Sequence, residues 1–331
     1  MYRVVTTDLL RPTIPEEAIL KEAGASLTYG DAKTEAELIE LTQDADAIID
    51  VYAPITAKVI NSLKKCRIIV RRGIGYDSVD IAAATAKGIP VANVQDYCIE
   101  EVADHTMALL LSVARRVVKG AKQIESGGWN FRALLPVPAL KESTLGLVGF
   151  GKIPRAVAER AKCFGLEIQT SDPFIPPEMA AEHGVKLVSL EELVKSSDFI
   201  SVHAPLNEKT RGMISQREFA VMKPSAVLIN TARGPVVDEA ALIEALKSGR
   251  IAAAALDVMT KEPPDPDNPL RKMDNVILTP HLAWYSERSA RLAGEKAGQD
   301  IVRVFNGYFP KYLVNPDVAK IRTDLKQTDK D

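Results

Sequence analysis

The chain has 331 residues, which is long for a single hydrophobic core and sufficient for two domains. Its 42 Lys and Arg residues nearly balance its 44 Asp and Glu residues without forming basic blocks, so we predict no nucleic-acid surface and no anionic-membrane surface. Three cysteines without C-x-x-C spacing, no signal-peptide pattern and no bilayer-length apolar run indicate a cytoplasmic protein with reduced thiols, no metal and a small-molecule partner.

The first hundred residues alternate short apolar runs with helical stretches, a pattern typical of a small α/β domain with a parallel sheet. The predicted elements are strands at 3–7 and 47–52 and helices at 15–23 and 34–42. A further strand, 67–72, leads into Gly73-Ile74-Gly75, where two glycines allow backbone N–H groups to converge. Such a nest suits an anion, for example a substrate carboxylate; an ordinary strand-to-helix turn is the alternative.

Residues 101–118 are apolar on nearly every helical face, so we predict a helix that is buried all round, connects two domains and takes part in a subunit contact. His105 on this helix is interpreted as an interior or interface histidine. A glycine- and proline-rich segment, 127–138, follows as an irregular excursion.

Residues 144–158 run from an apolar strand through closely spaced glycines into a helical pattern, which is typical of a dinucleotide-binding turn. Gly149 lets the chain reverse, and Gly151 leaves room for a pyrophosphate on the N–H groups of the next helix. Pro154 replaces the usual third glycine, which a first helical turn tolerates with some loss of helix-to-strand closeness. The next strand ends in Asp172, whose carboxylate can accept ribose hydroxyls and would repel a 2′-phosphate, so NAD is the predicted cofactor. The alternative is a tight turn beside an incidental acidic strand end.

Strands and helices continue to alternate after Asp172. The predicted strands are 185–187, 199–203, 226–230, 252–257 and 276–278. A final amphipathic helix, 286–306, is expected to return to the first domain, because no strand follows it. We therefore predict an α/β protein with two doubly wound, parallel-sheet, Rossmann-like domains. Their predicted ranges are 1–100 with 286–331 for a discontinuous, flavodoxin-like substrate-binding domain and 101–285 for an NAD-binding domain.

Three polar residues, Arg233, Glu262 and His281, stand at the ends of predicted elements of the second domain. A histidine can move a proton, and a neighbouring glutamate would orient its ring and stabilise its charged form. An arginine fork can bind a carboxylate and polarise the adjoining carbonyl. The set fits a hydride-transfer site for a 2-oxo acid, with Ile74-Gly75 as a second clamp on the carboxylate. Taken singly, each residue also fits an ordinary surface or loop role. Two rival histidines without an acidic companion are His183 and His203.

Five segments resemble the successive signatures of the D-isomer-specific 2-hydroxyacid dehydrogenases, in order and over nearly the whole chain. They are residues 149–153, 230–234, 255–258, 261–263 and 279–281. Within that family, residues 281–286 and 96–101 resemble the C-terminal-binding-protein branch, whose animal members act as NAD-sensing corepressors.

The resemblance implies roles for individual residues and a homodimer formed through the nucleotide domain. The implied catalytic residues are Arg233, Glu262 and His281, with His281 as the acid/base. The predicted cofactor-binding residues are Thr106, Gly149, Gly151, Lys152, Ile153, Asp172, Ala204, Pro205, Thr210, Thr231, Ala232 and Asp257. The implied substrate-binding residues are Tyr52, Ile74, Gly75, Arg233 and Trp284.

Two functions fit this set of residues. The favoured one is an NAD-dependent D-2-hydroxyacid dehydrogenase that reduces a 2-oxo acid by hydride transfer from NADH. The alternative is an NAD(H)-sensing, corepressor-like binding protein with weak dehydrogenase activity. The absence of a long disordered extension after about residue 320 favours the enzyme. The indole of Trp284 is expected to favour medium apolar 2-oxo acids over glyoxylate or pyruvate.

Overall fold

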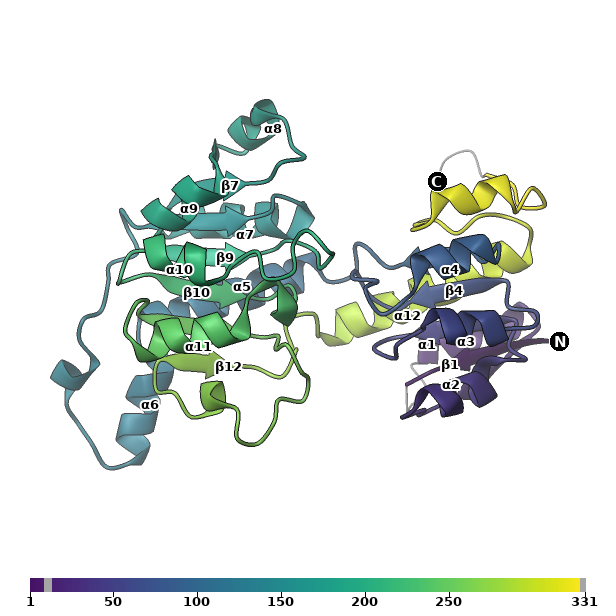
Figure 1. The fold of residues 1–331 in the computed structure, drawn as a ribbon, viewed down its shortest axis with the longest axis horizontal. Coiled ribbons are helices and arrows are strands. Elements are labelled where there is room, and N and C mark those ends of the chain that lie inside the picture. Colours follow the sequence, from purple (N-terminus) through teal and green to yellow (C-terminus); the bar gives the residue numbers. More distant parts are fainter. Residues whose placement is uncertain (9–13, 328–331) are drawn as a thin grey trace. The chain divides into compact units, whose positions relative to one another are not determined.

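The computed structural model describes residues 1–8 and 14–327, and the chain divides into two α/β units, each with its own parallel sheet (Figure 1). One unit comprises Met1–Cys98 with Tyr285–Asp331, and the other comprises Ile99–Trp284. The predicted fold class, including a discontinuous first unit completed by the last helix, is confirmed. Residues 9–13 and 328–331 of the predicted first domain lie outside the described residues. No helix of the described part is long and apolar enough to cross a membrane.

The first unit has a five-stranded sheet in the order β2-β1-β3-β4-β5, with every pair parallel. Its central strands are mostly apolar and buried because helices cover both faces. The strands are β1 Tyr2–Thr6, β2 Ala25–Tyr29, β3 Ala47–Asp50, β4 Ile68–Arg71 and β5 Val91–Asn93. The helices are α1 Ile14–Glu22, α2 Glu35–Thr42, α3 Ala57–Ser62, α4 Ile81–Ala86, α12 Glu287–Phe305 and η4 Pro316–Lys320.

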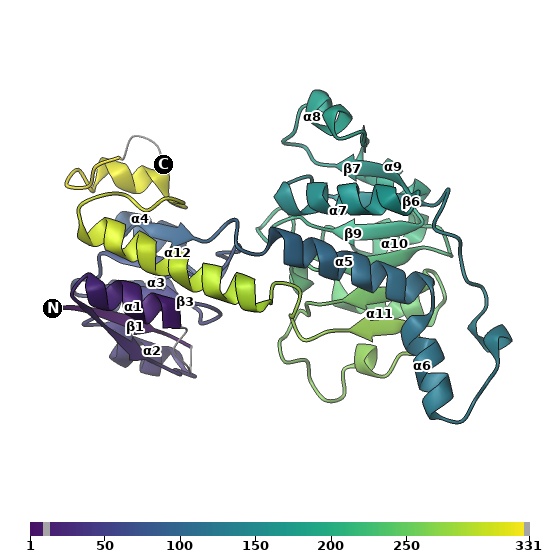
Figure 2. The ribbon, with the colours of Figure 1, turned by 180° about the vertical axis from the view of Figure 1, so that it is seen from behind.

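Helix α12 lies beside α1 on one face of this sheet (Figure 2), while α2, α3 and α4 cover the other face. Ser286 starts α12 as its N-cap, and its hydroxyl accepts a hydrogen bond from the Ser289 N–H. A Cβ atom at Gly294 would lie 2.8 Å from the Glu16 carboxyl carbon, so a glycine lets the two helices approach closely. The amphipathic face seen in the sequence is therefore covered by α1.

The second unit has a seven-stranded parallel sheet in the order β12-β11-β10-β9-β6-β7-β8. Chain order reverses between β6 and β9, which creates the switch point where doubly wound sheets bind ligands. The strands are β6 Thr144–Val148, β7 Glu167–Ser171, β8 Lys186–Leu187, β9 Phe199–Val202, β10 Val227–Asn230, β11 Ala253–Leu256 and β12 Val276–Leu278. The α-helices are α5 Ile99–Ala114, α6 Val117–Glu125, α7 Lys152–Cys163, α8 Pro177–Glu182, α9 Leu190–Ser196, α10 Gln216–Val221 and α11 Glu239–Lys247. The short 3-10 turns are η1 Phe131–Leu134, η2 Gly234–Val236 and η3 Pro269–Arg271.

The predicted single helix 101–118 is wrong in its extent. The chain breaks at Arg116, which has a left-handed backbone with φ of 57°, so α5 ends and α6 starts in a new direction. Within the single chain, Asp104 and Ala108 of α5 are exposed on one face of the helix. The opposite face packs into the core that α7 and the sheet share (Figure 2).

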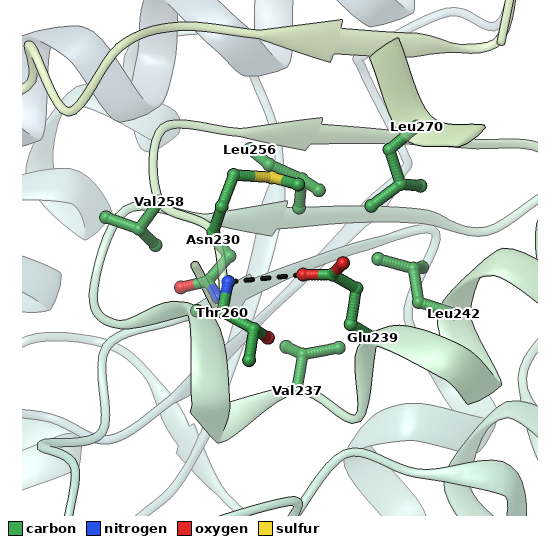
Figure 3. Close-up of a pocket in the computed structure, with 10 residues that line it drawn as sticks. Asn230, Val237, Glu239, Leu242, Leu256, Val258, Thr260 and Leu270 are labelled. Carbon is green, nitrogen blue, oxygen red and sulfur yellow. Dashed lines mark hydrogen bonds between the residues drawn. The ribbon is translucent and has the colours of Figure 1, made fainter. Parts of the chain in front are cut away.

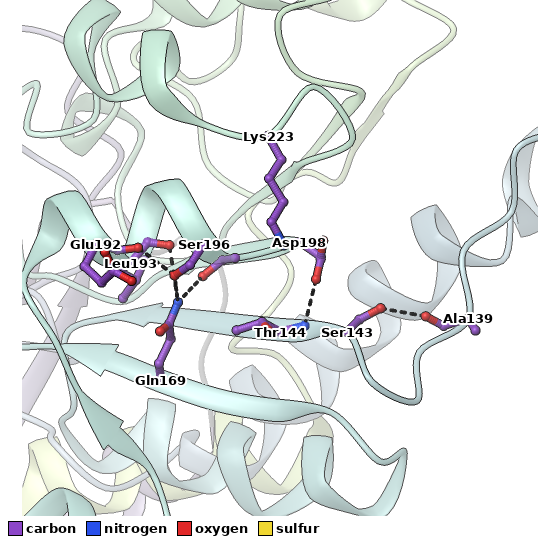
Figure 4. A network of polar contacts seen from close by, with 10 residues as sticks. Ala139, Ser143, Thr144, Gln169, Glu192, Leu193, Ser196, Asp198 and Lys223 are labelled. Carbon is purple, nitrogen blue, oxygen red and sulfur yellow. Dashed lines mark hydrogen bonds and ion pairs between the residues drawn. The ribbon is translucent and has the colours of Figure 1, made fainter.

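A polar network at the amino ends of the strands is structural (Figure 4). Gln169 of β7 donates to Ser196 and Ser197 at 2.7 and 2.9 Å, which ties the strand to the end of α9. Asp198 accepts from the Thr144 N–H at 2.9 Å and from Lys223 at 2.8 Å. These bonds fix the sheet at the end opposite to the turns that carry the candidate site.

Candidate functional site

The glycine turn between β6 and α7 leaves open space in front of the helix. Gly149 has φ of 95°, and a Cβ there would lie 3.2 Å from the His203 carbonyl carbon, so only glycine fits this turn easily. A Cβ at Gly151 would meet nothing within 4 Å. Gly151 is the N-cap of α7 and supplies no side-chain cap, and Lys152 and Ile153 form the first helical turn. The start of α7 is thus shaped to receive a phosphate on its N–H groups.

Asp172 follows β7 and faces the same turn. Its Oδ2 accepts from the Phe150 N–H at 2.9 Å, and its Oδ1 accepts from the Phe174 N–H at 2.9 Å. Each carboxylate oxygen has a second lone pair, so the group remains able to accept from ribose hydroxyls. The carboxylate is therefore held in place beside the glycine turn, where the sequence predicted the adenosine end of a dinucleotide.

The remaining predicted cofactor residues lie after β9 and β10 and on α5. The Thr106 hydroxyl donates to the Val102 carbonyl at 2.8 Å and lies 3.0 Å from the Thr231 hydroxyl, which joins α5 to the end of β10. Ala232 donates its N–H to Asn230 at 3.0 Å. Ala204 and Pro205 follow β9, and Thr210 donates to the Pro205 carbonyl at 2.5 Å, which closes the loop behind them.

His281 and Glu262 form a direct pair. His281 Nδ1 lies 2.7 Å from Glu262 Oε2, and the other carboxylate oxygen accepts from the Met259 N–H at 2.8 Å. Burial raises the pKa of Glu262, but these two hydrogen bonds and the charges of His281 and Arg233 outweigh it and hold that pKa below the usual range. The carboxylate is therefore ionised at neutral pH and accepts the proton of Nδ1, which leaves Nε2 as the nitrogen that can exchange a proton.

Arg233 lies at the end of β10, in a turn that touches the Glu262 loop. Its guanidinium donates to the Ala232 carbonyl at 2.8 Å, and its charge acts on Glu262. A Cβ at Gly234 would lie 2.0 Å from the Met259 carbonyl carbon, so the glycine is required for the two backbones to meet. The structure thus brings together the three predicted catalytic residues of the second unit.

Asp257 anchors the turn that carries His281. His281 has φ of 54°, which is rare for a residue with a side chain. The buried Asp257 carboxylate accepts from the Thr279 hydroxyl at 2.5 Å and from the N–H groups of 282–283 at 2.9 Å each. His105 Nε2 lies 3.1 Å from the same Thr279 hydroxyl. Burial raises the pKa of Asp257, but His105, whose Nε2 lies 3.5 Å from Asp257 Oδ1, together with the hydrogen bonds from Thr279 and the two N–H groups holds it below the usual range.

His105 and Thr279 therefore belong to the site, although the sequence reading gave neither a chemical role there. The feature of the sequence that could have indicated a role for Thr279 is its place immediately after β12 and two residues before His281.

The rival histidines have other surroundings. Desolvation lowers the pKa of His203 to about 3, and its ring contacts Ser201 Oγ at 2.9 Å. His183 is the C-cap of α8, and its ring packs edge-on against Phe150. A neutral ring and a packed ring are poorly placed to exchange protons, which leaves His281 as the candidate with a carboxylate partner.

The first unit carries its own group of predicted substrate residues. The Tyr52 ring is 53% exposed and lies under the Arg71 guanidinium, 5.8 Å from the ring centroid. Asn93 donates to the Ile74 carbonyl at 2.6 Å, which shapes the turn before Gly75. Arg71 is buried, and its Nε makes no hydrogen bond to any described residue. Arg71 was missed in the sequence, where the only signal was its place at the end of a strand, just before the glycine nest.

Comparison with known proteins gives one consistent family. Residues 107–283 match the family described as D-isomer specific 2-hydroxyacid dehydrogenase, NAD binding domain. The chain is 40% identical over 319 residues to D-3-phosphoglycerate dehydrogenase of Methanocaldococcus jannaschii, which covers 95% of this chain and 60% of that protein. It therefore spans less than two thirds of that relative's length. It is also 41% identical over 290 residues to glyoxylate reductase of Korarchaeum cryptofilum, covering 86% of this chain and 87% of that one.

A solved structure shows the same architecture. The crystal structure of a glyoxylate reductase from Paecilomyes thermophila aligns with a TM-score of 0.86 at 27% identity, and it covers 95% of this chain and 98% of its own.

Proposed function

This chain belongs to the D-isomer specific 2-hydroxyacid dehydrogenase family, and from that premise we propose that it reduces a 2-oxo acid to the D-2-hydroxy acid with NADH. The observation that carries the proposal is the His281–Glu262 pair with Arg233 beside it, at the carboxyl edge of a doubly wound sheet. A positioned acid/base, an orienting carboxylate and a guanidinium are the protein groups that carbonyl reduction by a nicotinamide requires.

The residues of the glycine turn fit NAD. Open space at Gly151, the uncapped start of α7 and the held carboxylate of Asp172 suit a pyrophosphate and a ribose. Bound NADH would supply the hydride to the substrate carbonyl carbon. The other proposed holders of the cofactor are Thr106, Gly149, Lys152, Ile153, Ala204, Pro205, Thr210, Thr231, Ala232 and Asp257.

His281 supplies the proton in this proposal. Glu262 fixes Nδ1 as the protonated nitrogen and stabilises the imidazolium, so Nε2 can donate to the developing alkoxide in reduction and accept in oxidation. The backbone of 279–283, held by Asp257, keeps the ring in the strained turn that aims it.

Cationic and N–H groups would bind the acid end of the substrate. Arg233 offers a fork for the carboxylate and lowers the cost of charge on the carbonyl oxygen. In the first unit, the Arg71 guanidinium, which lies over the Tyr52 ring, and the N–H groups of the Ile74–Gly75 turn offer further donors. Tyr52 and Trp284 are proposed to contact the remainder of the substrate, with Trp284 setting its size.

Two arguments favour different substrate acids. The indole of Trp284 favours a medium apolar 2-oxo acid, whereas several relatives are named glyoxylate reductase and others D-3-phosphoglycerate dehydrogenase. The resemblance of residues 281–286 to C-terminal-binding proteins supports the alternative of a ligand-sensing binding protein with weak activity.

The α6 to η1 region supports a homodimer. Large apolar side chains are exposed along it, with Trp129 89% and Phe131 69% exposed, and α6 buries none of its residues within the chain. An apolar surface of this kind on a single chain is typical of a contact with another subunit. We propose a homodimer formed through this region and a cytoplasmic location; analytical ultracentrifugation of wild type and Trp129→Ser tests the former.

A screen of 2-oxo acids for NADH oxidation, with chiral analysis of the product, tests the proposed activity. The proposal expects turnover of at least one acid to its D-2-hydroxy product. NADH binding without turnover of any acid would favour the binding-protein alternative, and an L product would contradict the stereochemical assignment.

A further inference from the structure

The loop that carries Glu262 depends on one side chain from a neighbouring helix. Residues 257–268 contain no helix or strand, so their backbone groups need partners from elsewhere. Glu239, the first residue of α11, provides one of these partners and a second contact: Oε2 accepts from the Thr260 N–H at 3.2 Å and Oε1 accepts from the Asn268 side-chain amide at 2.7 Å. Figure 3 shows the bond between Glu239 and Thr260. One carboxylate thus ties the loop down on both sides of Glu262.

We propose that Glu239 is a positioning residue for the acid/base pair, because it fixes the loop in the place where Glu262 reaches both Met259 and His281. The inference rests on the proposed function. Glu239 would touch neither cofactor nor substrate and would act only through Glu262. Nothing in the family motifs of the sequence assigned it a role.

The loop also packs against the Arg233 turn. Gly234 packs so closely that a Cβ there would lie 2.0 Å from the Met259 carbonyl carbon and 2.4 Å from the Thr260 nitrogen. The Thr260 nitrogen therefore lies close to the Gly234 backbone and also binds the Glu239 carboxylate. A shift at Thr260 moves Met259, whose N–H binds Glu262, and so changes the geometry of the catalytic pair.

Apolar packing does not replace this bond. A cavity of about 10 Å³, roughly the volume one water needs, lies where α11 faces the loop, lined by Glu239, Leu242, Met259 and Thr260 among others (Figure 3). Side chains therefore leave this small, partly open space unfilled on the helix side of the loop. The position of the loop therefore depends more on its hydrogen bonds to Glu239 than it would in a fully packed core.

Both partners of Glu239 are donors, so its two oxygens are specifically required. In Glu239→Gln one acceptor remains, and the new amide NH₂ faces a donor. In Asn268→Asp two carboxylates face each other. In the double variant E239Q/N268D the introduced amide can donate to the introduced carboxylate and still accept from the Thr260 N–H. The reciprocal exchange therefore restores both contacts.

The experiment compares these variants with Glu244→Gln, a matched charge removal at an exposed position of the same helix. We expect Glu239→Gln and Asn268→Asp each to lower kcat for 2-oxo acid reduction by about tenfold, as for a lost hydrogen bond to a charged group, with KM for NADH unchanged. E239Q/N268D should return kcat to within about twofold of wild type, since the lost contact is re-formed. In a Glu262→Gln background, Glu239→Gln should have no further effect.

A second readout is independent of turnover. The pH titration of the Glu262 carboxyl carbon by ¹³C NMR should move toward the usual glutamate range in Glu239→Gln, because the loosened loop weakens the Met259 bond that lowers its pKa. The midpoint should not move in Glu244→Gln and should return in the double variant.

Equal loss in the Glu262→Gln background, no rescue by the double exchange, or an unmoved Glu262 titration would each overturn the positioning role. If the wild type turns over no 2-oxo acid, the proposed function fails while the NMR comparison still decides the inference. Thermal unfolding of each variant checks that the chain is folded, and Asn268→Asp gives the same test if Glu239→Gln does not fold.

Discussion

Replacing Glu262 by Gln separates proton transfer from ligand binding. In the structure, its two oxygens accept from two different donors, the Met259 N–H at 2.8 Å and His281 Nδ1 at 2.7 Å. The amide has a single acceptor oxygen, so it cannot accept from both. If the oxygen keeps Met259, the NH₂ group faces Nδ1, and the imidazole takes the tautomer with its proton on Nε2. That ring is neutral, donates poorly and cannot accept a proton where the reaction needs it.

The magnitude follows from these contacts. A hydrogen bond to a charged group contributes about 1.5–3 kcal/mol, and about 1.36 kcal/mol changes a rate tenfold. The wrong tautomer adds to this loss; in the serine-protease triad the corresponding carboxylate-to-amide exchange lowers kcat by about 10⁴-fold. We therefore expect Glu262→Gln to lower kcat by ~10²- to 10⁴-fold.

The assay is single-turnover NADH oxidation by stopped flow, with NADH affinity measured separately by fluorescence titration. NADH affinity should stay nearly unchanged, because Glu262 is assigned no contact with the cofactor. A loss of less than about threefold in the chemical step would refute the orienting role of Glu262.

Three further outcomes follow from other parts of the structure. If Asp172 binds the adenosine ribose as proposed, its negative charge lies where NADP carries a phosphate, so kcat/KM should favour NADH over NADPH by on the order of a hundredfold, and comparable efficiency would contradict this role. Truncation in Trp284→Ala should change the kcat/KM ratio between 4-methylthio-2-oxobutanoate and glyoxylate; an unchanged ratio shows that the indole does not shape the pocket. Burial, and then the neighbouring Asp8 carboxylate, raise the pKa of Asp50 to about 7, so the protonated form is favoured in the fold. The free energy of unfolding should therefore decline as pH rises from about 4 to 7, and Asp50→Asn, compared with wild type by urea unfolding at pH 5 and 8, should reduce that slope. A smaller decline of the same sign should remain, because burial raises the pKa of Asp300 to about 6. A slope of equal size in both proteins would mean that Asp50 is not the titrating group.

The sequence predicted the parts of the fold in which burial is continuous. The strands β6, β9, β10 and β11 are mostly apolar and buried along nearly their whole length, because both of their faces are covered. Strand β2 was missed because it lies at the sheet edge and its residues are mostly half-buried, which gives a mixed pattern. The break at Arg116 was missed because a left-handed residue without glycine leaves no local signal.

The sequence also predicted some residues of the candidate site and missed others. Gly149, Asp172, Arg233 and His281 could be predicted because each follows a recognisable strand, and parallel topology gathers such residues at one edge. The supporting contacts could not be predicted in this way. His105 and Thr279 are 174 residues apart, and Glu239 meets a loop that has no periodic pattern, so only the tertiary structure brings these groups together.

The most direct test of the account is His281→Asn, measured in two ways on the same protein. We expect NADH still to bind with nearly wild-type affinity. Under conditions where the chemical step is rate-limiting, kcat for 2-oxo acid reduction at neutral pH should fall by ~10²- to 10⁴-fold. An unchanged kcat, or a loss that comes entirely from weaker NADH binding, would contradict the assignment of His281 as the acid/base.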